Sequence, residues 1–174
     1  MSYEINKKAV GEIEEMFNSI SNEYDFLNKI ITFGTDAKNK KEIASLVKEK
    51  KPSKVLDIAT GTADIPINLS IIENCQITGV DISKNMISIG RKKIKSKNLL
   101  KKINLEMGNA EKLKYNSNYF DVVTICFGVR NFQNLERSLN EAHRVLKNSG
   151  RLIIYETSTP KNLIIRFFYL IISS

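Results

Sequence analysis

The stretch Lys54-Val-Leu-Asp-Ile-Ala-Thr-Gly-Thr-Ala63 decides the fold of this chain of 174 residues. Its first five residues, up to Ile58, are mostly apolar and are typical of a short buried strand. The next five contain Gly61, which allows a tight turn and a close approach of the backbone to a ligand. Asp64 is then expected to cap a helix, in which Pro66 is tolerated because it lies in the first turn.

The same alternation of strand and helix continues along the chain. The helix after Asp64 is expected to run to about Glu73, and Ser83 is expected to cap a second helix that runs to about Lys97. Further strands are expected at 76–81, 103–107, 121–126 and 151–156, a helix at 135–146, and a turn at 148–150 with Gly150 at the helix C-terminus. This order predicts an α/β fold with a largely parallel sheet flanked by helices.

We interpret residues 1–174 as a single domain in three parts, because no repeat or linker divides the chain. Residues 1–52 are expected to form a helical extension, since Met16, Ile20, Tyr24 and Leu27 fall at helical spacings. Residues 53–160 are expected to form a cofactor-binding core. Residues 161–174 are expected to begin a truncated C-terminal part, so that the last strands of the sheet are missing.

The charge balance is basic, with 27 Lys and Arg against 19 Asp and Glu, for a net charge of +8. Much of it lies in residues 84–102, which hold basic side chains and no acid. Such a stretch suits nucleic acid, an anionic membrane surface, or simply a solvated helix face, and we favour the last. No aromatic residue lies among these lysines, which weakens the case for single-stranded nucleic acid.

Metal and redox chemistry are not expected. Cys75 and Cys126 are far apart and form no CxxC motif, so they are interpreted as buried free thiols. His143 is the sole histidine. It falls within a predicted helix, away from the strand ends, and a structural role is expected for it.

Candidate ligand-binding residues follow three of the predicted strands, and ligands of doubly wound sheets bind at the carboxyl ends of strands. Asp57 ends the first strand, where a carboxylate suits an ammonium group. Asp81 ends the second strand and can accept hydrogen bonds from both hydroxyls of a ribose. The segment 108–111, which includes Asn109 and Ala110, follows the third strand and is placed to border an adenine.

These positions predict an adenosine cofactor, and the loop after the first strand favours S-adenosylmethionine over NAD. A pyrophosphate site needs the pattern G-x-G-x-x-G, and only Gly61 of the three glycines is present. Asp57 would repel a phosphate but suits the amino-acid portion of S-adenosylmethionine. The alternative is an α/β domain with ordinary turns and no cofactor.

Two motifs make the chain resemble a known family. The first is Met16-Phe-Asn-Ser-Ile-Ser-Asn-Glu-Tyr-Asp-Phe-Leu-Asn28 with Phe33-Gly34, and the second is Thr124-Ile-Cys-Phe-Gly-Val-Arg-Asn131. Both resemble signatures of the demethylmenaquinone and ubiquinone C-methyltransferases, and the likeness runs from about residue 13 to 170. The less specific segments 144–147 and 150–156 are shared with many class I methyltransferases. The resemblance therefore implies a Rossmann-like class I methyltransferase fold.

The resemblance also implies which residues contact S-adenosylmethionine. Position by position, the cofactor contacts of the family fall on Thr62, Asp81, Asn109 and Ala110, and a serine of the family falls on Cys126. Ala63 stands where the family usually has glycine, which places a methyl group beside the cofactor loop.

The implied reaction transfers a methyl group to a ring carbon of a reduced polyprenyl quinone. Arg130 is the expected catalytic residue, because a guanidinium stays charged and can stabilise the phenolate oxygen of the acceptor. Asn131 and Tyr24 are expected to orient the ring and Tyr169 to close the pocket. An ion-pair role for Arg130 and core packing of the two tyrosines are the alternatives.

A polyprenyl substrate places the enzyme in the cytoplasm, with peripheral contact at the inner face of the membrane. The basic stretch around Lys92 and the apolar segment around Phe167 are candidates for that contact. At ten residues, the segment 163–172 is half the roughly 20 needed to span a bilayer.

Menaquinone precursors are the favoured acceptors and ubiquinone precursors the first alternative. Specific binding of nucleic acid is not expected, because the Asn/Asp-Pro-Pro-aromatic motif is absent after the fourth strand. A non-catalytic fragment is the other alternative, and the oligomeric state is left open.

Overall fold

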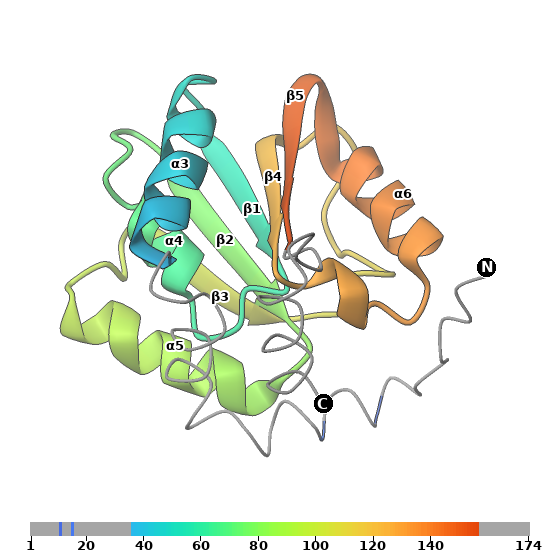
Figure 1. The fold of residues 1–174 in the computed structure, drawn as a ribbon, viewed down its shortest axis with the longest axis horizontal. Coiled ribbons are helices and arrows are strands. Elements are labelled where there is room, and N and C mark those ends of the chain that lie inside the picture. The colour runs from blue at the N-terminus through green and yellow to red at the C-terminus, as the bar shows by residue number, and fades with distance from the viewer. Residues whose placement is uncertain (1–10, 12–14, 16–35, 157–174) are drawn as a thin grey trace, which may run out of the picture.

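The computed structural model describes Gly11, Glu15 and residues 36–156. In this part of the chain five strands form one sheet in the order β3-β2-β1-β4-β5, and every neighbouring pair is parallel (Figure 1). The strands are β1 Lys54–Ile58, β2 Gln76–Asp81, β3 Ile103–Met107, β4 Phe120–Cys126 and β5 Leu146–Tyr155. The helices are α3 Asp36–Lys48, α4 Asp64–Leu69, α5 Lys84–Ser96, the 3-10 turn η1 Val129–Asn131, and α6 Leu135–Val145. The predicted α/β fold with a parallel sheet is confirmed.

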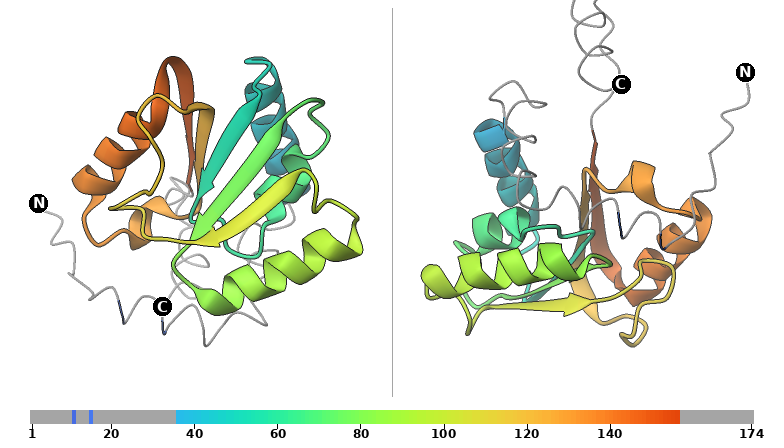
Figure 2. Two further views of the ribbon diagram at one scale, coloured as in Figure 1. Left: turned by 180° about the vertical axis from the view of Figure 1, so that it is seen from behind. Right: turned by 90° about the horizontal axis from the view of Figure 1, so that it is seen from below.

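Helices cover both faces of the sheet, because successive strand residues point to opposite sides. Val55 and Val122 pack in a core cluster with residues of α3, α4 and α5. Their neighbours Leu56 and Val123 pack in a second cluster with residues of α6. Figure 2 shows the resulting three layers edge-on, with α6 on the other side of the sheet from α4 and α5.

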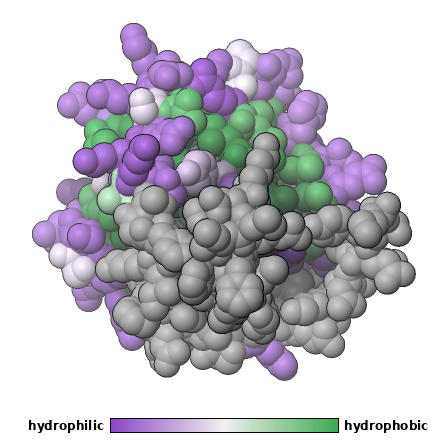
Figure 3. Space-filling view, viewed as in Figure 1, coloured by the Kyte–Doolittle hydropathy of each residue, from purple (hydrophilic) through white to green (hydrophobic). Residues whose placement is uncertain are grey.

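Hydrophobic residues also reach the surface on one side of the molecule. Figure 3 shows them gathered in the described part of this face, with hydrophilic residues around the rim. Ile71 and Leu100 are among the large apolar side chains of the described residues that are exposed. Apolar atoms make up a large share of any protein surface, so we draw no conclusion about function from these exposed residues.

Most predicted boundaries agree with the structure, and the Ser83 cap of α5 is confirmed by the hydrogen bond that its side chain accepts from the backbone N–H of Met86. The prediction that Asp64 caps α4 was wrong. The cap position is Ala63, in a left-handed conformation and without a side-chain cap, and Asp64 is the first residue of the helix. The helix also ends at Leu69 rather than near Glu73.

The predicted turn at 148–150 is instead an irregular part of β5. Phe120 pairs with Leu146 and Val122 with Arg151, so that residues 147–150 bulge opposite a single residue of β4. The prediction that Gly150 ends a helix was therefore wrong. Gly150 instead packs closely against the side chain of Leu146, from which a Cβ at this position would lie only 2.5 Å.

Both cysteines are buried and free, as the sequence predicts. In the described ranges, no group of three His, Cys, Asp or Glu side chains is arranged to hold a metal ion. No helix among the described residues combines the length and apolarity needed to cross a membrane. Tyr24, Tyr169 and the segment 163–172, which the sequence analysis singled out, lie outside the described residues.

Candidate functional site

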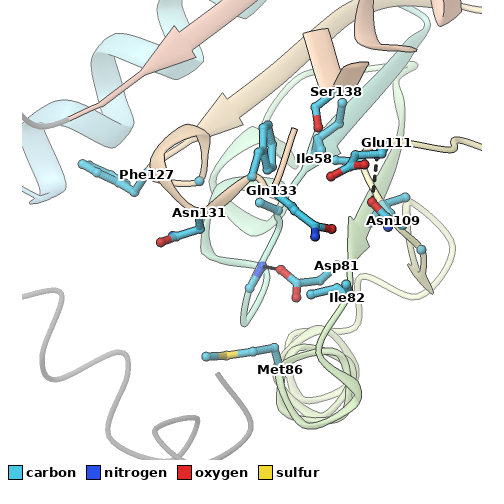
Figure 4. Close-up of a pocket in the computed structure, with 17 residues that line it drawn as sticks. Ile58, Asp81, Ile82, Met86, Asn109, Glu111, Phe127, Asn131, Gln133 and Ser138 are labelled. Carbon is cyan, nitrogen blue, oxygen red and sulfur yellow. Dashed lines mark hydrogen bonds between the residues drawn. The ribbon is translucent and has the colours of Figure 1, made fainter. Parts of the chain in front are cut away.

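A pocket opens where β1, β2, β3 and β4 end, at the edge of the sheet where parallel α/β folds bind ligands (Figure 4). It encloses about 700 Å³, counting the space open to solvent at its mouth. Its walls come from the loops after these strands and from the first turns of α5 and α6. The lining residues are Ile58, Ala59, Gly61, Val80, Asp81, Ile82, Met86, Gly108, Asn109, Ala110, Glu111, Phe127, Gly128, Asn131, Phe132, Gln133 and Ser138.

The loop after β1, residues 59–63 and here called the β1 loop, forms one wall. Gly61 has a φ of 53°, which explains the glycine that the sequence analysis singled out. Ala59 and Ala63 also lie in the left-handed region, with φ values of 57° and 68°. L-residues other than glycine visit this region at a cost, so the surroundings must hold the loop in place.

Asp81 closes the base of the pocket and is 8% exposed. Its Oδ2 accepts a hydrogen bond from the N–H of Gly61 at 2.8 Å, and its Oδ1 accepts one from the N–H of Ser83 at 2.8 Å. Burial raises the pKa of Asp81, and the backbone N–H groups of Ser83, Gly61 and Ile82 oppose that shift. A carboxylate offers about four lone-pair sites, so beside these backbone bonds Asp81 keeps acceptor capacity toward the pocket.

Asp57 lies beneath the β1 loop rather than on the pocket wall, and it is 1% exposed. Thr124 donates to its Oδ1 at 2.6 Å and Thr60 donates to its Oδ2 at 2.7 Å. Burial raises the pKa of Asp57 to about 7, against the lowering effect of these two hydroxyls and with a further rise from the charge of Asp81. The sequence did not point to Thr124 as a partner, because it reaches Asp57 only through the β1–β4 pairing; Thr60 is a local partner, three residues away.

The segment after β3 borders the pocket on the other side. The Asn109 side chain lies there, and its Oδ1 accepts a hydrogen bond from the N–H of Glu111 at 2.8 Å (Figure 4). The carboxylate of Glu111 in turn accepts from the N–H of Asn134, the cap of α6, at 2.9 Å. Ala110 lines the pocket between them. The predicted segment 108–111 is therefore brought to the pocket and fixed to α6.

The loop after β4, residues 127–131 and here called the β4 loop, supplies the last wall. Asn131 and Phe127 line the pocket, and Phe127 has a left-handed φ of 59°. Arg130 is beside these residues in η1 but does not line the pocket. Its side chain is 46% exposed, and its Nη1 lies 3.5 Å from Oε1 of Glu156.

Two other predicted contacts are buried behind the wall. Thr62 is 2% exposed, and its hydroxyl accepts a hydrogen bond from Nζ of Lys93 at 3.0 Å. Cys126 is 8% exposed, and burial raises the pKa of its thiol with help from the charges of Asp57 and Glu156. Neither side chain is among those that line the pocket.

Several lining residues were missed by the sequence analysis. Met86 reaches the pocket from α5, while Phe132, Gln133 and Ser138 follow the β4 loop (Figure 4). No local motif marks these residues. They reach the pocket because α5 and α6 both begin at this edge of the sheet.

Comparison with known sequences gives a consistent result. A sequence profile described as the ubiE/COQ5 methyltransferase family matches residues 4–174. A demethylmenaquinone methyltransferase of Bacteroides fragilis is 36% identical over 91% of this chain and 65% of its own length. The protein of the same name from Thermotoga maritima is 40% identical over 83% of this chain and 61% of its own length. A ubiquinone/menaquinone biosynthesis C-methyltransferase of Geobacter sulfurreducens is 35% identical over 96% of this chain and 66% of its own length. The chain thus spans slightly less than two thirds of the length of these relatives.

Solved structures agree on the fold. A putative S-adenosyl-L-methionine-dependent methyltransferase of Methanococcus maripaludis superposes with a TM-score of 0.65 at 21% identity, over 98% of this chain and 72% of the other. A [4+2]-cyclase superposes with a TM-score of 0.74 at 18% identity, over 89% of this chain and 62% of the cyclase. Because a cyclase and a methyltransferase share this architecture, the fold alone does not decide the reaction.

Proposed function

The chain belongs to the ubiE/COQ5 methyltransferase family, and from this premise we propose that its pocket binds S-adenosylmethionine for the methylation of a polyprenyl quinol. The observation that carries the proposal is the position of Asp81 at the tip of β2, on the pocket floor and bonded to Gly61 of the β1 loop. A ribose hydroxyl pair would bind the remaining lone pairs of this carboxylate.

The rest of the pocket is compatible with an adenosine. Apolar side chains such as Ile58, Val80 and Phe132 supply walls for an adenine ring. Asn109 and Ala110 would border that ring, with Asn109 held by its bond to Glu111. Three other expected cofactor residues do not line the pocket: Asp57, Thr62 and Cys126. They would influence cofactor binding indirectly, through the charge of Asp57 or by holding the neighbouring loops in place.

Asp57 is proposed to favour the ammonium group of the cofactor by its charge. A cation brought near a carboxylate lowers the pKa of that carboxylate, so binding near pH 7 is expected to release a proton from Asp57. The heat of titration should then depend on the ionisation enthalpy of the buffer, and this dependence should vanish in Asp57→Asn. A buffer-independent heat in the unmodified protein would contradict the proposal.

When bound, S-adenosylmethionine supplies the electrophilic methyl group. Arg130 is proposed to face the acceptor, where its permanent charge would stabilise the phenolate oxygen that makes the ring carbon nucleophilic. Asn131, which lines the pocket, is proposed to orient the acceptor ring together with Tyr24, and Tyr169 is proposed to close the pocket; both tyrosines lie outside the described residues.

The favoured acceptor is a demethylmenaquinol, and a benzoquinol precursor of ubiquinone is the alternative. Two of the three relatives described above bear the name demethylmenaquinone methyltransferase, and the third bears both quinone names. The test is to incubate the purified chain with methyl-labelled S-adenosylmethionine and each quinol in turn. Label in menaquinol is the expected result. Label in neither quinol, from a folded sample that binds the cofactor, would refute the proposed reaction.

We also propose a peripheral contact with the cytoplasmic face of the membrane, where a polyprenyl substrate resides. The exposed side of α5 and the end of β3 form a basic groove lined by Lys84, Ile87, Ser88, Arg91, Lys92, Lys95 and Met107. Its basic side chains would be attracted to anionic lipid headgroups, and the half-exposed Met107 would contact the acyl boundary. Co-sedimentation with vesicles should rise with their anionic lipid content and fall when Lys84, Lys92 and Lys95 are changed to Gln. Co-sedimentation that ignores lipid charge would refute this contact.

A further inference from the structure

The β1 loop is held from outside the pocket as well as from inside, and the geometry points to Lys93 as a positioning residue for cofactor binding. The inference rests on the proposed function, since it concerns the loop that forms one wall of the proposed cofactor pocket. Lys93 lies in α5 and does not line the pocket, so its effect on cofactor binding would be indirect, through the position of the β1 loop.

The contacts of Lys93 join three elements. Its Nζ donates to the hydroxyl of Thr62 at 3.0 Å and also to the carboxylate of Asp64. The other oxygen of Asp64 accepts from Nζ of Lys40, in α3, at 2.7 Å. Burial alone would raise the pKa of Asp64, but its bonds to Lys40 and Lys93 outweigh burial and hold that pKa below its usual range. Asp64 is therefore charged at neutral pH and keeps both lysines in place.

Two residues on one face of α5, Gly90 and Lys93, contact the β1 loop. Met86, Gly90 and Lys93 are spaced four and three residues apart, so they lie along one side of the helix. Met86 lines the pocket. At Gly90 a Cβ would lie 3.2 Å from both the carbonyl carbon of Thr62 and the Cβ of Ala63, so the helix packs directly on the loop. Lys93 then bonds the same part of the loop one turn further along.

The loop needs such support because two of its alanines adopt left-handed conformations. From the pocket side, Asp81 accepts the N–H of Gly61. From the α5 side, Lys93 donates to the next residue, Thr62. Loss of the bond between Lys93 and Thr62 should lower the fraction of molecules in which the β1 loop holds Gly61 against Asp81. The apparent affinity for the cofactor falls with that fraction.

The competing interpretation is that Lys93 only forms a salt bridge at the start of α4. Its side chain is 25% exposed and that of Asp64 is 38% exposed, and such pairs contribute little to stability. In that case Lys93→Met would change thermal unfolding slightly and leave cofactor affinity unchanged. The two interpretations therefore differ in cofactor affinity and in the role of the Thr62 hydroxyl.

A double-mutant cycle separates them. The dissociation constant of S-adenosylmethionine is measured by calorimetry for the unmodified chain, Lys93→Met, Thr62→Val and the double variant. We expect Lys93→Met to weaken binding about tenfold, as for the loss of one charged hydrogen bond. The double variant should bind no more weakly than the weaker single variant, because both remove the same bond. Affinity unchanged in Lys93→Met, or effects that multiply in the double variant, would overturn the inference.

A matched control and a readout without cofactor complete the test. Lys41→Met removes the same charge from an exposed side chain of α3 and should leave affinity unchanged. Amide hydrogen exchange at Gly61 should speed up in both Lys93→Met and Thr62→Val, while exchange in β1 stays slow. Failure of the unmodified chain to bind S-adenosylmethionine would refute the proposed function. Unchanged exchange at Gly61 would refute the role of Lys93 on its own.

Discussion

The β1 loop and the β4 loop leave the sheet side by side, yet they differ in how firmly they are held. The β1 loop is bonded to β2 through Thr60 and Gly61, whose N–H groups donate to Val80 and Asp81, and to α5 through Lys93. Its threonines are buried. Among the described residues, the β4 loop is closed by its own turn bonds and by the bond from the N–H of Phe127 to the carbonyl of Tyr155, and its Arg130 side chain is about half exposed.

This difference matches the two tasks proposed for the loops. A cofactor that is the same in every turnover is best held by a wall that is already in its final shape, since preorganisation avoids an ordering cost on binding. An acceptor that must enter and leave needs exposed groups at the mouth. The structure therefore predicts that changes in the β1 loop alter cofactor affinity, and that changes in the β4 loop alter turnover.

The largest expected effect concerns the β4 loop. Arg130→Gln should lower kcat by about 10²- to 10³-fold, as for the loss of one group that stabilises an oxyanion. The dissociation constant of S-adenosylmethionine should stay the same, because Arg130 does not line the pocket. Steady-state kinetics with demethylmenaquinol and calorimetry with the cofactor measure the two quantities. A parallel loss of affinity would erase the distinction between the loops.

The next largest effect concerns the pocket floor. Asp81→Ala should weaken S-adenosylmethionine binding about 100-fold, because charged hydrogen bonds to two hydroxyls are lost at about 1.5–3 kcal/mol each, in part offset by water. Glu73→Ala, which removes an exposed carboxylate from the loop before β2, is the control and should bind normally. Comparable affinity in the two variants would show that Asp81 is not a cofactor ligand.

The contact between the two loops gives a third prediction. A Cβ at Gly128 would lie 2.5 Å from the Cβ of Ala59, so Gly128→Ala should lower the free energy of unfolding by about 2 kcal/mol. Adding Ala59→Gly should restore most of that loss, since glycine removes the methyl group and suits the left-handed φ of this position. Urea unfolding of the single and double variants measures both steps. If the second change brought no recovery, the loops would not be in contact.

The last prediction concerns the pH dependence that Asp57 imposes. Its pKa is about 7 in the folded protein and 3.8 as the reference value, so the folded state binds a proton more tightly than the unfolded chain. Stability should therefore fall as pH rises from about 4 through 7. Asp57→Asn keeps a hydrogen-bonding group between Thr60 and Thr124 but cannot ionise.

The free energy of unfolding is to be measured for both proteins at pH 5 and pH 8. The unmodified protein should lose about 2–3 kcal/mol more than Asp57→Asn over this interval, because the two states differ by one bound proton over about two pH units. Equal losses would mean that Asp57 is not a buried titrating group.

The sequence predicted the parts of the site that depend on strand ends alone. Asp81 ends β2, Gly61 and Asn109 follow β1 and β3 within a few residues, and parallel strands bring their ends to one edge. The environment of Asp57 was out of reach, because Thr124 lies 67 residues away and meets it only through strand register. The role of Asp64 was misjudged for the same reason, since its partners Lys40 and Lys93 belong to other helices.

The proposed function depends most directly on the identity of the cofactor, so the deciding measurement is a calorimetric titration of the unmodified, folded chain with S-adenosylmethionine and, separately, with NAD. We expect saturable binding of S-adenosylmethionine at one site per chain and no binding of NAD. Binding of NAD alone, or of neither compound, would contradict it.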